Sequence, residues 1–172
     1  MTEPQPASVL LFDDYFQAHY ARAVTVATRV LGSRAEAEDV AQDVFAVLMR
    51  DGVDRPPGPL LYARVLRRAL NAQRSTIRRA ARELRHAVLR RPLLCDGDDP
   101  AASLETREQQ ALLASALRRL NRRDAAVLVL RHSADCTYRD IAGALGLTPA
   151  HVGTILARAE RALFKEIQHD DA

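Results

Sequence analysis

The chain has 172 residues, enough for one large domain or two small ones, and its 48% hydrophobic and 27% charged residues are ordinary for a soluble globular protein. No apolar run approaches 18 residues and the first residues lack basic and apolar signal regions, so we expect a cytoplasmic protein without a membrane span. The net charge of +3 conceals an uneven distribution of charge along the chain. Residues 61–91 carry ten Arg and one Glu, whereas residues 1–60 carry five basic and nine acidic side chains. Such clustering is costly unless a polyanion or an acidic surface meets the basic segment.

Apolar residues at helical spacing predict a first helix over about residues 9–31, which Gly32 ends. The Ser-Arg-Ala-Glu sequence at residues 33–36 is a capping-box pattern that opens a second helix, which ends near Gly52. We expect the buried side of this second helix to consist of Ala37, Val40, Ala41, Val44, Val47 and Leu48. The Arg-Pro-Pro-Gly-Pro sequence at residues 55–59 excludes a helix there and predicts a stiff, exposed loop.

A third, long helix is expected over about residues 60–90, with a buried side made of Leu61, Val65, Ala69 and Leu70. Pro92 ends this helix, and residues 93–102 have the composition of a linker. Apolar spacing and cap signatures in the C-terminal half predict four more helices, over about residues 101–120, 121–131, 137–146 and 148–167. The cap signatures are Asn-Arg-Arg-Asp at residues 121–124, Thr-Tyr-Arg-Asp at residues 137–140 and Thr-Pro at residues 148–149. The sequence shows no strand pattern and no internal repeat. The predicted fold class is therefore all-α, with two small helical domains at residues 1–91 and 103–172 and a flexible linker at 92–102.

The last two predicted helices have the pattern of a helix-turn-helix. This motif needs a small residue where the helices touch, a residue of positive φ in the turn and an apolar inward residue after it, and these positions hold Ala142, Gly146 and Val152. The inward stripe continues with Leu147, Leu156, Ala159 and Leu163, and the opposite face, suited to a major groove, presents His151, Thr154, Arg158 and Arg161. Gly153 and Ile155 stand where a basic side chain would strengthen binding, so this module alone should bind DNA weakly. An ordinary helical hairpin can share the spacing.

The second predicted helix carries a cluster of polar side chains opposite Val40 and Val44, consisting of Glu38, Asp39, Gln42 and Asp43. Acids outnumber bases on this helix, so we expect little pairing within it. The cluster predicts a basic protein partner, and a merely solvated face is the alternative.

The third predicted helix carries a stripe about 20 Å long by helix rise, made of Arg64, Arg67, Arg68, Asn71, Arg74 and Arg78. A stripe of this length matches several phosphates of a nucleic acid. Tyr62 stands near its start and could stack on an unpaired base, although a single Tyr beside Leu61 more often belongs to the core.

No catalytic or metal-binding pattern accompanies these surfaces. The sequence has no phosphate-binding glycine loop, no H-E-x-x-H motif and no nucleophile–base pair at a recognisable turn, so we expect neither an enzyme nor a cofactor. His132 and Cys136 have i,i+4 spacing but no second ligand pair nearby, so no metal site is expected. Cys95 lies 41 positions before Cys136 and a disulfide between them is not expected, whereas a redox role of Cys95 stays open.

Two motifs in a fixed order carry a family resemblance. The first is Ala-Glu-Asp-Val-Ala-Gln-Asp-Val-Phe at residues 37–45, and the second is Tyr-Arg-Asp-Ile-Ala-Gly-Ala-Leu-Gly-Leu-Thr at residues 138–148, followed by Val152 and Arg158-Ala159. With these motifs, residues 10–168 resemble the extracytoplasmic-function group of bacterial sigma factors, the smallest promoter-specificity subunits of RNA polymerase.

The resemblance implies a protein that binds core RNA polymerase and promoter DNA through three sets of residues. Those that would dock on the clamp helices of the largest polymerase subunit are Glu38, Asp39, Gln42 and Asp43. Those that would meet the −10 element are Arg55, Tyr62, Arg64, Arg67, Arg68, Asn71 and Arg74. Those that would meet the −35 element are Thr137, Tyr138, Arg139, Thr148, His151, Thr154 and Arg158. An anti-sigma factor or another regulator is a further expected partner.

Departures from the family pattern keep the promoter sequence from being carried over from relatives. The −10 loop is unusually rich in proline, and Asn121 stands where the family commonly has Pro. The alternative function is a free-standing helix-turn-helix regulator that binds a palindromic operator alone, and the weak charge of the last helix argues against it. A helical adaptor without a role in DNA binding is a third reading, against which the arginine stripe argues.

Overall fold

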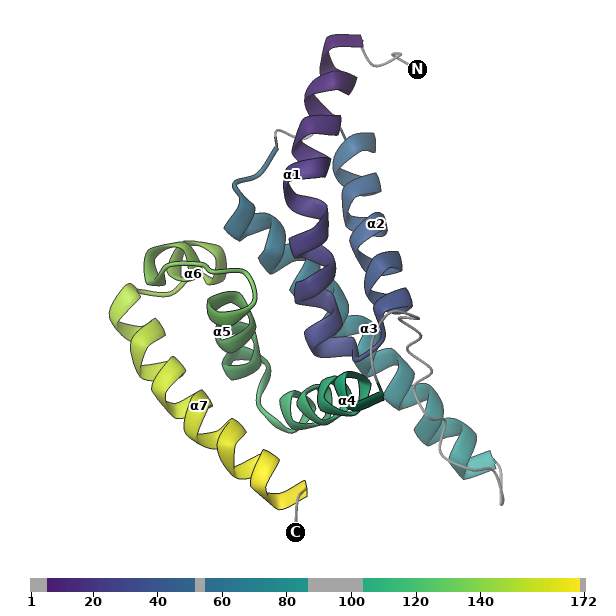
Figure 1. Cartoon of the computed structure of the whole chain (residues 1–172), viewed down its shortest axis with the longest axis vertical. Coiled ribbons are helices and arrows are strands. Elements are labelled where there is room, and N and C mark those ends of the chain that lie inside the picture. The colour runs from purple at the N-terminus through teal and green to yellow at the C-terminus, as the bar shows by residue number, and fades with distance from the viewer. Residues whose placement is uncertain (1–5, 52–54, 87–103, 171–172) are drawn as a thin grey trace.

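The structure is a computed structural model that describes residues 6–51, 55–86 and 104–170, and within these ranges every regular element is an α-helix. The N-terminal half consists of α1 (Pro6–Leu31), α2 (Arg34–Arg50) and α3 (Gly58–His86), and the C-terminal half of α4 (Leu104–Arg119), α5 (Arg122–His132), α6 (Tyr138–Leu145) and α7 (Pro149–Asp170) (Figure 1). The predicted all-α class is confirmed, and none of these helices is long and apolar enough to cross a membrane. The predicted linker at residues 92–102 lies outside the described residues.

Local capping residues set the helix boundaries where the sequence predicts them. Gly32 takes the left-handed conformation, with φ of +77°, and so ends α1 without the steric cost that a side chain would carry. The Ser33 side chain accepts a hydrogen bond from the backbone N–H of Glu36 at 3.3 Å and begins α2. Asn121 begins α5 in the same way, by accepting from the N–H of Asp124 at 2.9 Å.

The core of the N-terminal half is built around Phe45 of α2, which the prediction of the buried side left out. Its ring is 2% exposed and lies 5.0 Å from the ring centroid of Phe16 and 5.9 Å from that of Tyr20, both on α1. Val47, which was predicted to be buried, is 44% exposed. The two residues lie about 200° apart around the helix, and α1 covers only the flank that holds Phe45. Val44 is half-buried, and the other predicted residues of this side are buried.

The proline-rich segment differs from the exposed, non-helical loop that was predicted. Pro56 is buried, and its carbonyl accepts a hydrogen bond from the Tyr15 hydroxyl at 2.8 Å. Helix α3 already begins at Gly58, so Pro59 stands in its first turn. A proline is tolerated there because the first N–H groups of a helix have no partner within the helix. The expectation that the prolines exclude a helix was therefore wrong at the end of the segment.

Helix α5 forms the centre of the C-terminal half. Its residues 124–130 are all buried, between α7 and α6 on one side and α3 on the other. On α3 the predicted residues Leu61, Val65, Ala69 and Leu70 are buried as expected. One hydrophobic core therefore runs from the first half of the chain into the second.

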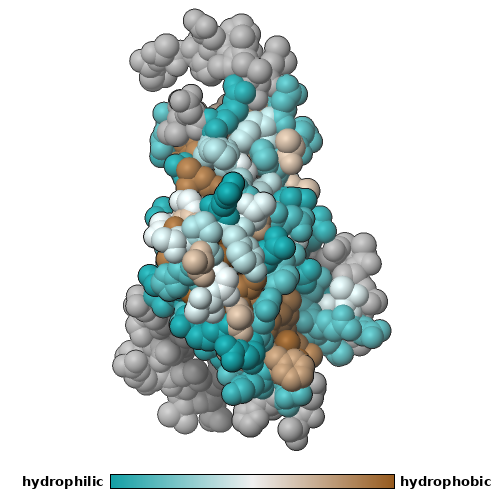
Figure 2. Space-filling model, turned by 90° about the vertical axis from the view of Figure 1, so that its left-hand side faces the viewer, coloured by the Kyte–Doolittle hydropathy of each residue, from teal (hydrophilic) through white to brown (hydrophobic). Residues whose placement is uncertain are grey.

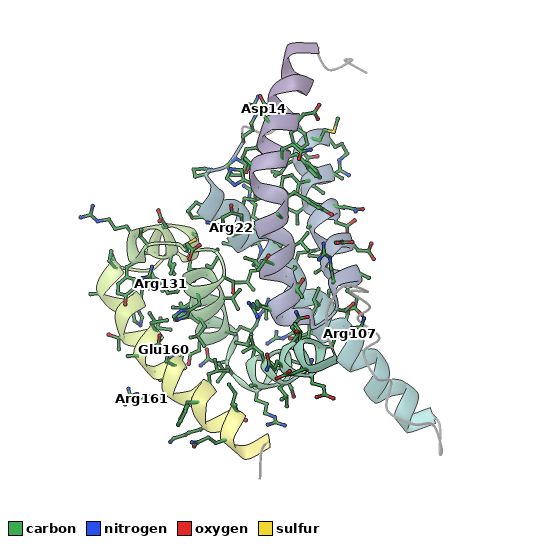
Figure 3. The ribbon with its side chains drawn as sticks, viewed as in Figure 1. Asp14, Arg22, Arg107, Arg131, Glu160 and Arg161 are labelled. Atoms are coloured by element: carbon green, nitrogen blue, oxygen red, sulfur yellow. The ribbon has the colours of Figure 1, made fainter. Side chains whose placement is uncertain are left out.

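Polar contacts and one close approach also join the two halves, and we call this packing the closed arrangement. Arg22 of α1 donates from Nη1 to the carbonyl of Ala134 at 3.3 Å and pairs with Asp135 at 3.3 Å, on the connection between α5 and α6 (Figure 3). Arg122 of α5 donates to Oδ1 of Asn71 on α3 at 2.8 Å. At the end of α1, a Cβ atom on Gly32 would lie 3.2 Å from the Cβ of Ala114 on α4, so the backbone approaches closely there.

Candidate functional site

Helices α6 and α7 have the geometry of a helix-turn-helix. Ala142 and Val152, the predicted contact residues, are 4% and 0% exposed. Gly146 takes the left-handed conformation in the turn, with φ of +66°. The Thr148 hydroxyl then accepts a hydrogen bond from the N–H of His151 at 3.3 Å and starts α7. The three positions that the motif requires are therefore filled as predicted.

Ile155 does not lie on the exposed face of α7, where the sequence analysis placed it. Its side chain is 1% exposed, because it stands one helical turn after Val152 on the inward side. Gly153 is half-buried and lies against the ring of Tyr138 on α6. The weak positive charge of α7 thus has a packing cause at Ile155, since a basic side chain there would replace a core residue.

The candidate −35 residues share an exposed side of α6 and α7. All seven are exposed, namely Thr137, Tyr138, Arg139, Thr148, His151, Thr154 and Arg158. Polar residues cover most of this side of the molecule (Figure 2). The Thr154 hydroxyl donates to the carbonyl of Ala150 at 3.2 Å, whereas no described residue forms a hydrogen bond or ion pair with the side chains of His151 and Arg139. These two side chains are therefore available to an external partner.

A complete capping box fixes the beginning of α6. The Thr137 hydroxyl donates to the Asp140 carboxylate at 2.6 Å and accepts from its N–H at 3.2 Å, while the Thr137 N–H donates back at 2.9 Å. The hydrogen bond from the hydroxyl, followed by that from the backbone, lowers the pKa of Asp140 below its usual value. The Arg131 guanidinium lies 5.7 Å from the centroid of the Tyr138 ring and donates to the carbonyl of Cys136 at 3.1 Å. The start of α6 is thus tied to α5.

Arg158 differs from the other candidate −35 residues because its guanidinium, although exposed, is held by a buried carboxylate of the protein. Its Nε donates to Asp124 of α5 at 3.1 Å, and its Nη2 donates to the other carboxylate oxygen. The Asp124 side chain is 4% exposed. This hydrogen bonding, and then the charge of Asp124, raises the pKa of Arg158 above its usual value. The sequence analysis read Asp124 only as part of a helix cap and did not connect it with α7.

The acidic face of α2 is partly paired, through one ion pair within the helix and one with α3. Glu38 accepts from Nε of Arg34 one turn earlier at 2.9 Å. Asp43 pairs with Arg68 of α3 at 2.9 Å, so a candidate polymerase residue and a candidate −10 residue hold each other. Asp39 is exposed, and no described residue pairs with it. Gln42 donates to the hydroxyl of Tyr20 at 3.3 Å.

The arginine stripe of α3 borders a groove between the two halves. The groove has a volume of about 560 Å³ and an apolar floor, and its four basic residues are Arg64, Arg67, Arg122 and Arg123. None of these four pairs with a carboxylate among the described residues. The sequence analysis missed Arg122 and Arg123, because it read residues 121–124 only as a helix cap. Arg55 and Arg74 are exposed outside the groove, and the side chain of Arg78 lies outside the described ones.

Tyr62 belongs to the core, which was one of its two predicted roles. It is 5% exposed, and its hydroxyl lies 2.8 Å from Nδ1 of His19 on α1. Burial, followed by the charge of Arg22, lowers the pKa of His19. A Cβ atom on Gly58 would lie 3.1 Å from the His19 ring and 3.3 Å from the Tyr62 ring, so both rings pack closely against the first residue of α3. In the sequence, the spacing of Tyr15 and His19, one helical turn apart, was the available signal for this support, and the structure places their ring centroids 4.6 Å apart.

The described residues contain no group of three or more His, Cys, Asp or Glu side chains that could hold a metal ion. The Cys136 side chain is buried, and burial, the largest cause, raises the pKa of its thiol to about 11. His132, which was considered as its co-ligand, instead lies 3.1 Å from Glu160 of α7. Cys95 lies outside the described residues.

Comparison with known proteins adds three findings. The family model for Sigma-70 region 2 matches residues 15–83, and that for Sigma-70, region 4 matches residues 110–163. Among solved structures, the sigma factor RpoE in complex with the anti-sigma factor NepR from Bartonella quintana is similar, with a TM-score of 0.60 and 18% identity over 91% of this chain and 96% of that one. At that identity the likeness shows a shared fold. No curated protein matches the chain.

Proposed function

The chain belongs to the sigma-70 family as an extracytoplasmic-function sigma factor, and on this premise we propose which of its surfaces meet polymerase and promoter DNA. The observation that carries the function is the presence of region 2 over residues 15–83 and region 4 over residues 110–163, in this order in one chain. As a sigma factor, the chain binds core RNA polymerase, recognises the −10 and −35 elements and promotes strand opening. Its role is that of an initiation factor and not of an enzyme.

Core polymerase would dock on the exposed face of α2. Asp39 and Gln42 project into solvent, and Glu38 and Asp43 lie beside them in ion pairs with bases of this chain. A basic partner surface would compete for those two carboxylates and would meet Asp39 without such competition. Asp39 is therefore the residue of this face from which we expect the largest effect.

The −10 element would lie along the arginine stripe of α3. Arg64, Arg67, Asn71 and Arg74 offer cations and an amide on one side of the helix, and Arg55 adds a cation in the segment before it, all suited to the phosphates of a melted strand. Arg68 would join them once it leaves Asp43. Tyr62 supports this surface from the core, and its burial argues against a direct stacking role.

The −35 element would be read as duplex DNA by the helix-turn-helix. The first turns of α7 present His151 and Thr154, and the start of α6 presents Thr137, Tyr138 and Arg139. The N-terminal residues of a recognition helix are the ones that reach base edges in the major groove. Thr148 stands at the start of α7, where backbone and hydroxyl groups commonly contact phosphates.

An anti-sigma factor is the regulator that we expect for this chain. The similar RpoE structure contains the anti-sigma factor NepR. In the closed arrangement Arg64 and Arg67 face α5 and α6 across the groove. A partner that stabilises this arrangement would keep the two arginines from promoter DNA.

Run-off transcription with purified core polymerase on a genomic fragment library tests the function. We expect discrete start sites that appear only when the chain is added, and they would deliver its −10 and −35 sequences together. No new start site, combined with specific binding of palindromic duplex DNA by the chain alone, would overturn the sigma-factor assignment in favour of a free-standing regulator.

A further inference from the structure

The buried carboxylate of Asp124 connects the beginning of α5 with the recognition helix. It accepts hydrogen bonds from Nδ2 of Asn121 at 2.8 Å and from Nε and Nη2 of Arg158. Its own backbone N–H donates to Oδ1 of Asn121 at 2.9 Å. Both carboxylate oxygens and the backbone N–H of Asp124 therefore have hydrogen-bond partners, and its contact with Arg158 holds α5 and α7 together at this point.

The guanidinium of Arg158 is committed to this contact. The side chain is 58% exposed, yet the edge formed by Nε and Nη2 is turned toward a carboxylate that is 4% exposed. If Arg158 left to contact a base, Asp124 would remain as a buried charge without a counter-ion. Leaving a charge in that state costs more than a single base contact returns. The energetically favoured position of Arg158 is therefore against Asp124, with or without DNA.

The contact stands close to the residues that would read DNA. Thr154 lies one helical turn before Arg158, and His151 lies about two turns before Arg158, so all three lie on one side of α7. Farther along the same helix, Glu160 lies 3.1 Å from His132 at the other end of α5. This second contact is between exposed side chains, so Asp124 provides the better enclosed of the two polar links between α5 and α7.

We propose that Arg158 does not read bases but is a positioning residue, and that Asp124 sets through it the place of α7 on α5 and hence the presentation of His151 and Thr154 to the −35 element. This inference rests on the proposed function of α7 in −35 recognition. It changes the role of Arg158 from a base contact, as predicted from the sequence, to a structural link.

The test compares single and paired substitutions in the full chain with core polymerase. Each variant is assayed on a set of promoters that differ at every −35 position. Asp124→Asn and Arg158→Ala should each lower −35-dependent transcription at all positions alike, by a factor on the order of tenfold, and Arg158→Ala should have the larger effect because it leaves Asp124 as a buried charge without a counter-ion. The two together should be no worse than Arg158→Ala alone, because both remove the same link and Asp124→Asn also removes the buried charge.

A fourth variant separates positioning from reading. Asp124→Leu combined with Arg158→Met replaces the ion pair by apolar side chains of similar volume, an exchange that proteins often tolerate well. We expect this variant to regain thermal stability and to show the −35 base preference of the unaltered chain. If Arg158 reads a base, it would instead lose discrimination at one −35 position, as Arg158→Ala would, while Asp124→Asn would not, and that pattern overturns the proposal.

Two further readouts keep failure of the link apart from failure of the proposed function. Thermal unfolding of the unaltered chain, Asp124→Asn, Arg158→Ala and their double variant in the absence of DNA gives the coupling between Asp124 and Arg158 directly, and additive effects there would refute the link. Binding to core polymerase and transcription by the unaltered chain report on the sigma-factor function alone. A purely global loss of stability would lower polymerase binding as well, which the positioning role does not predict.

Discussion

His19 is the residue whose titration the fold changes most directly at a functional surface. It lies half-buried between Tyr15 and Tyr62, beneath the first residue of α3, with Arg22 as the charged neighbour. Because its pKa is lowered in the folded chain, the unfolded chain takes up this proton first as the pH falls. Protonation of His19 therefore leaves the free energy of unfolding unchanged above about pH 6.5. It lowers that free energy as the pH drops from there toward the lowered pKa of folded His19.

We expect the melting temperature of the chain to fall between pH 7 and pH 5.5 by more than that of a His19→Gln variant, which keeps a polar group near Tyr62 but does not titrate. The measurement is thermal unfolding by circular dichroism of both proteins at several pH values. Parallel pH dependence of the two would show that His19 carries no such linkage.

At the scale of elements, the exposed face of α2 and the first turns of α7 make separate predictions. Asp39→Lys should weaken binding to core polymerase by roughly tenfold or more, because a like charge placed against a basic surface is strongly unfavourable. Asp14→Lys makes the same change of charge at an exposed position of α1 (Figure 3) and is the matched control. Fluorescence anisotropy with labelled chains measures the affinity of both variants for core polymerase. An equal loss of affinity in the two variants would contradict docking on α2.

For α7, His151→Ala and Thr154→Ala should each relax the preference at a particular −35 position, by about 1 kcal/mol or more for a lost base contact. Lys165→Ala, an exposed change near the other end of the same helix, should leave the preference unchanged. Run-off transcription on promoters with single −35 substitutions distinguishes them. A preference that none of the three variants changes would remove His151 and Thr154 from the reading surface.

Element boundaries are predictable here because they depend on local chemistry. Gly32, Asn121, Thr137 and Gly146 act on their own few neighbours, so the sequence contains all that is needed to place them. The buried face of α2 was predicted less well, since Phe45 is enclosed only because α1 covers that flank. Burial at the edge of a helix depends on the neighbouring element, which periodicity within one helix does not specify.

At the scale of the whole molecule, the closed arrangement depends on contacts between residues far apart in sequence. Arg22 and Ala134 are 112 positions apart, and Asp124 and Arg158 are 34 apart. No local pattern predicts such pairs, which is why the sequence analysis assigned Arg158 to DNA and did not assign Arg22 at all. The two domain ranges predicted from composition remain a prediction, since their boundary lies outside the described residues.

Arg22→Ala should loosen the closed arrangement. It removes the hydrogen bond to Ala134 and the exposed pair with Asp135, together worth at most about 1–2 kcal/mol. We expect a larger radius of gyration by X-ray scattering and tighter binding of a single-stranded −10 oligonucleotide by the free chain. Arg29→Ala, an exposed change on the same helix, is the control. A radius that is the same in both variants would show that Arg22 does not hold the halves together.

The four arginines of the groove make closure dependent on ionic strength. Arg64 and Arg67 line the groove together with Arg122 and Arg123, and none of the four forms an ion pair with a described carboxylate, so the repulsion between their like charges opposes the closed arrangement. Dissolved salt screens that repulsion, over about 8–10 Å under ordinary buffer conditions, and so favours closure. The same salt weakens contacts with DNA phosphates. Both effects act against promoter binding, so binding of the −10 strand by the free chain should fall more steeply with added salt than its number of phosphate contacts alone would dictate.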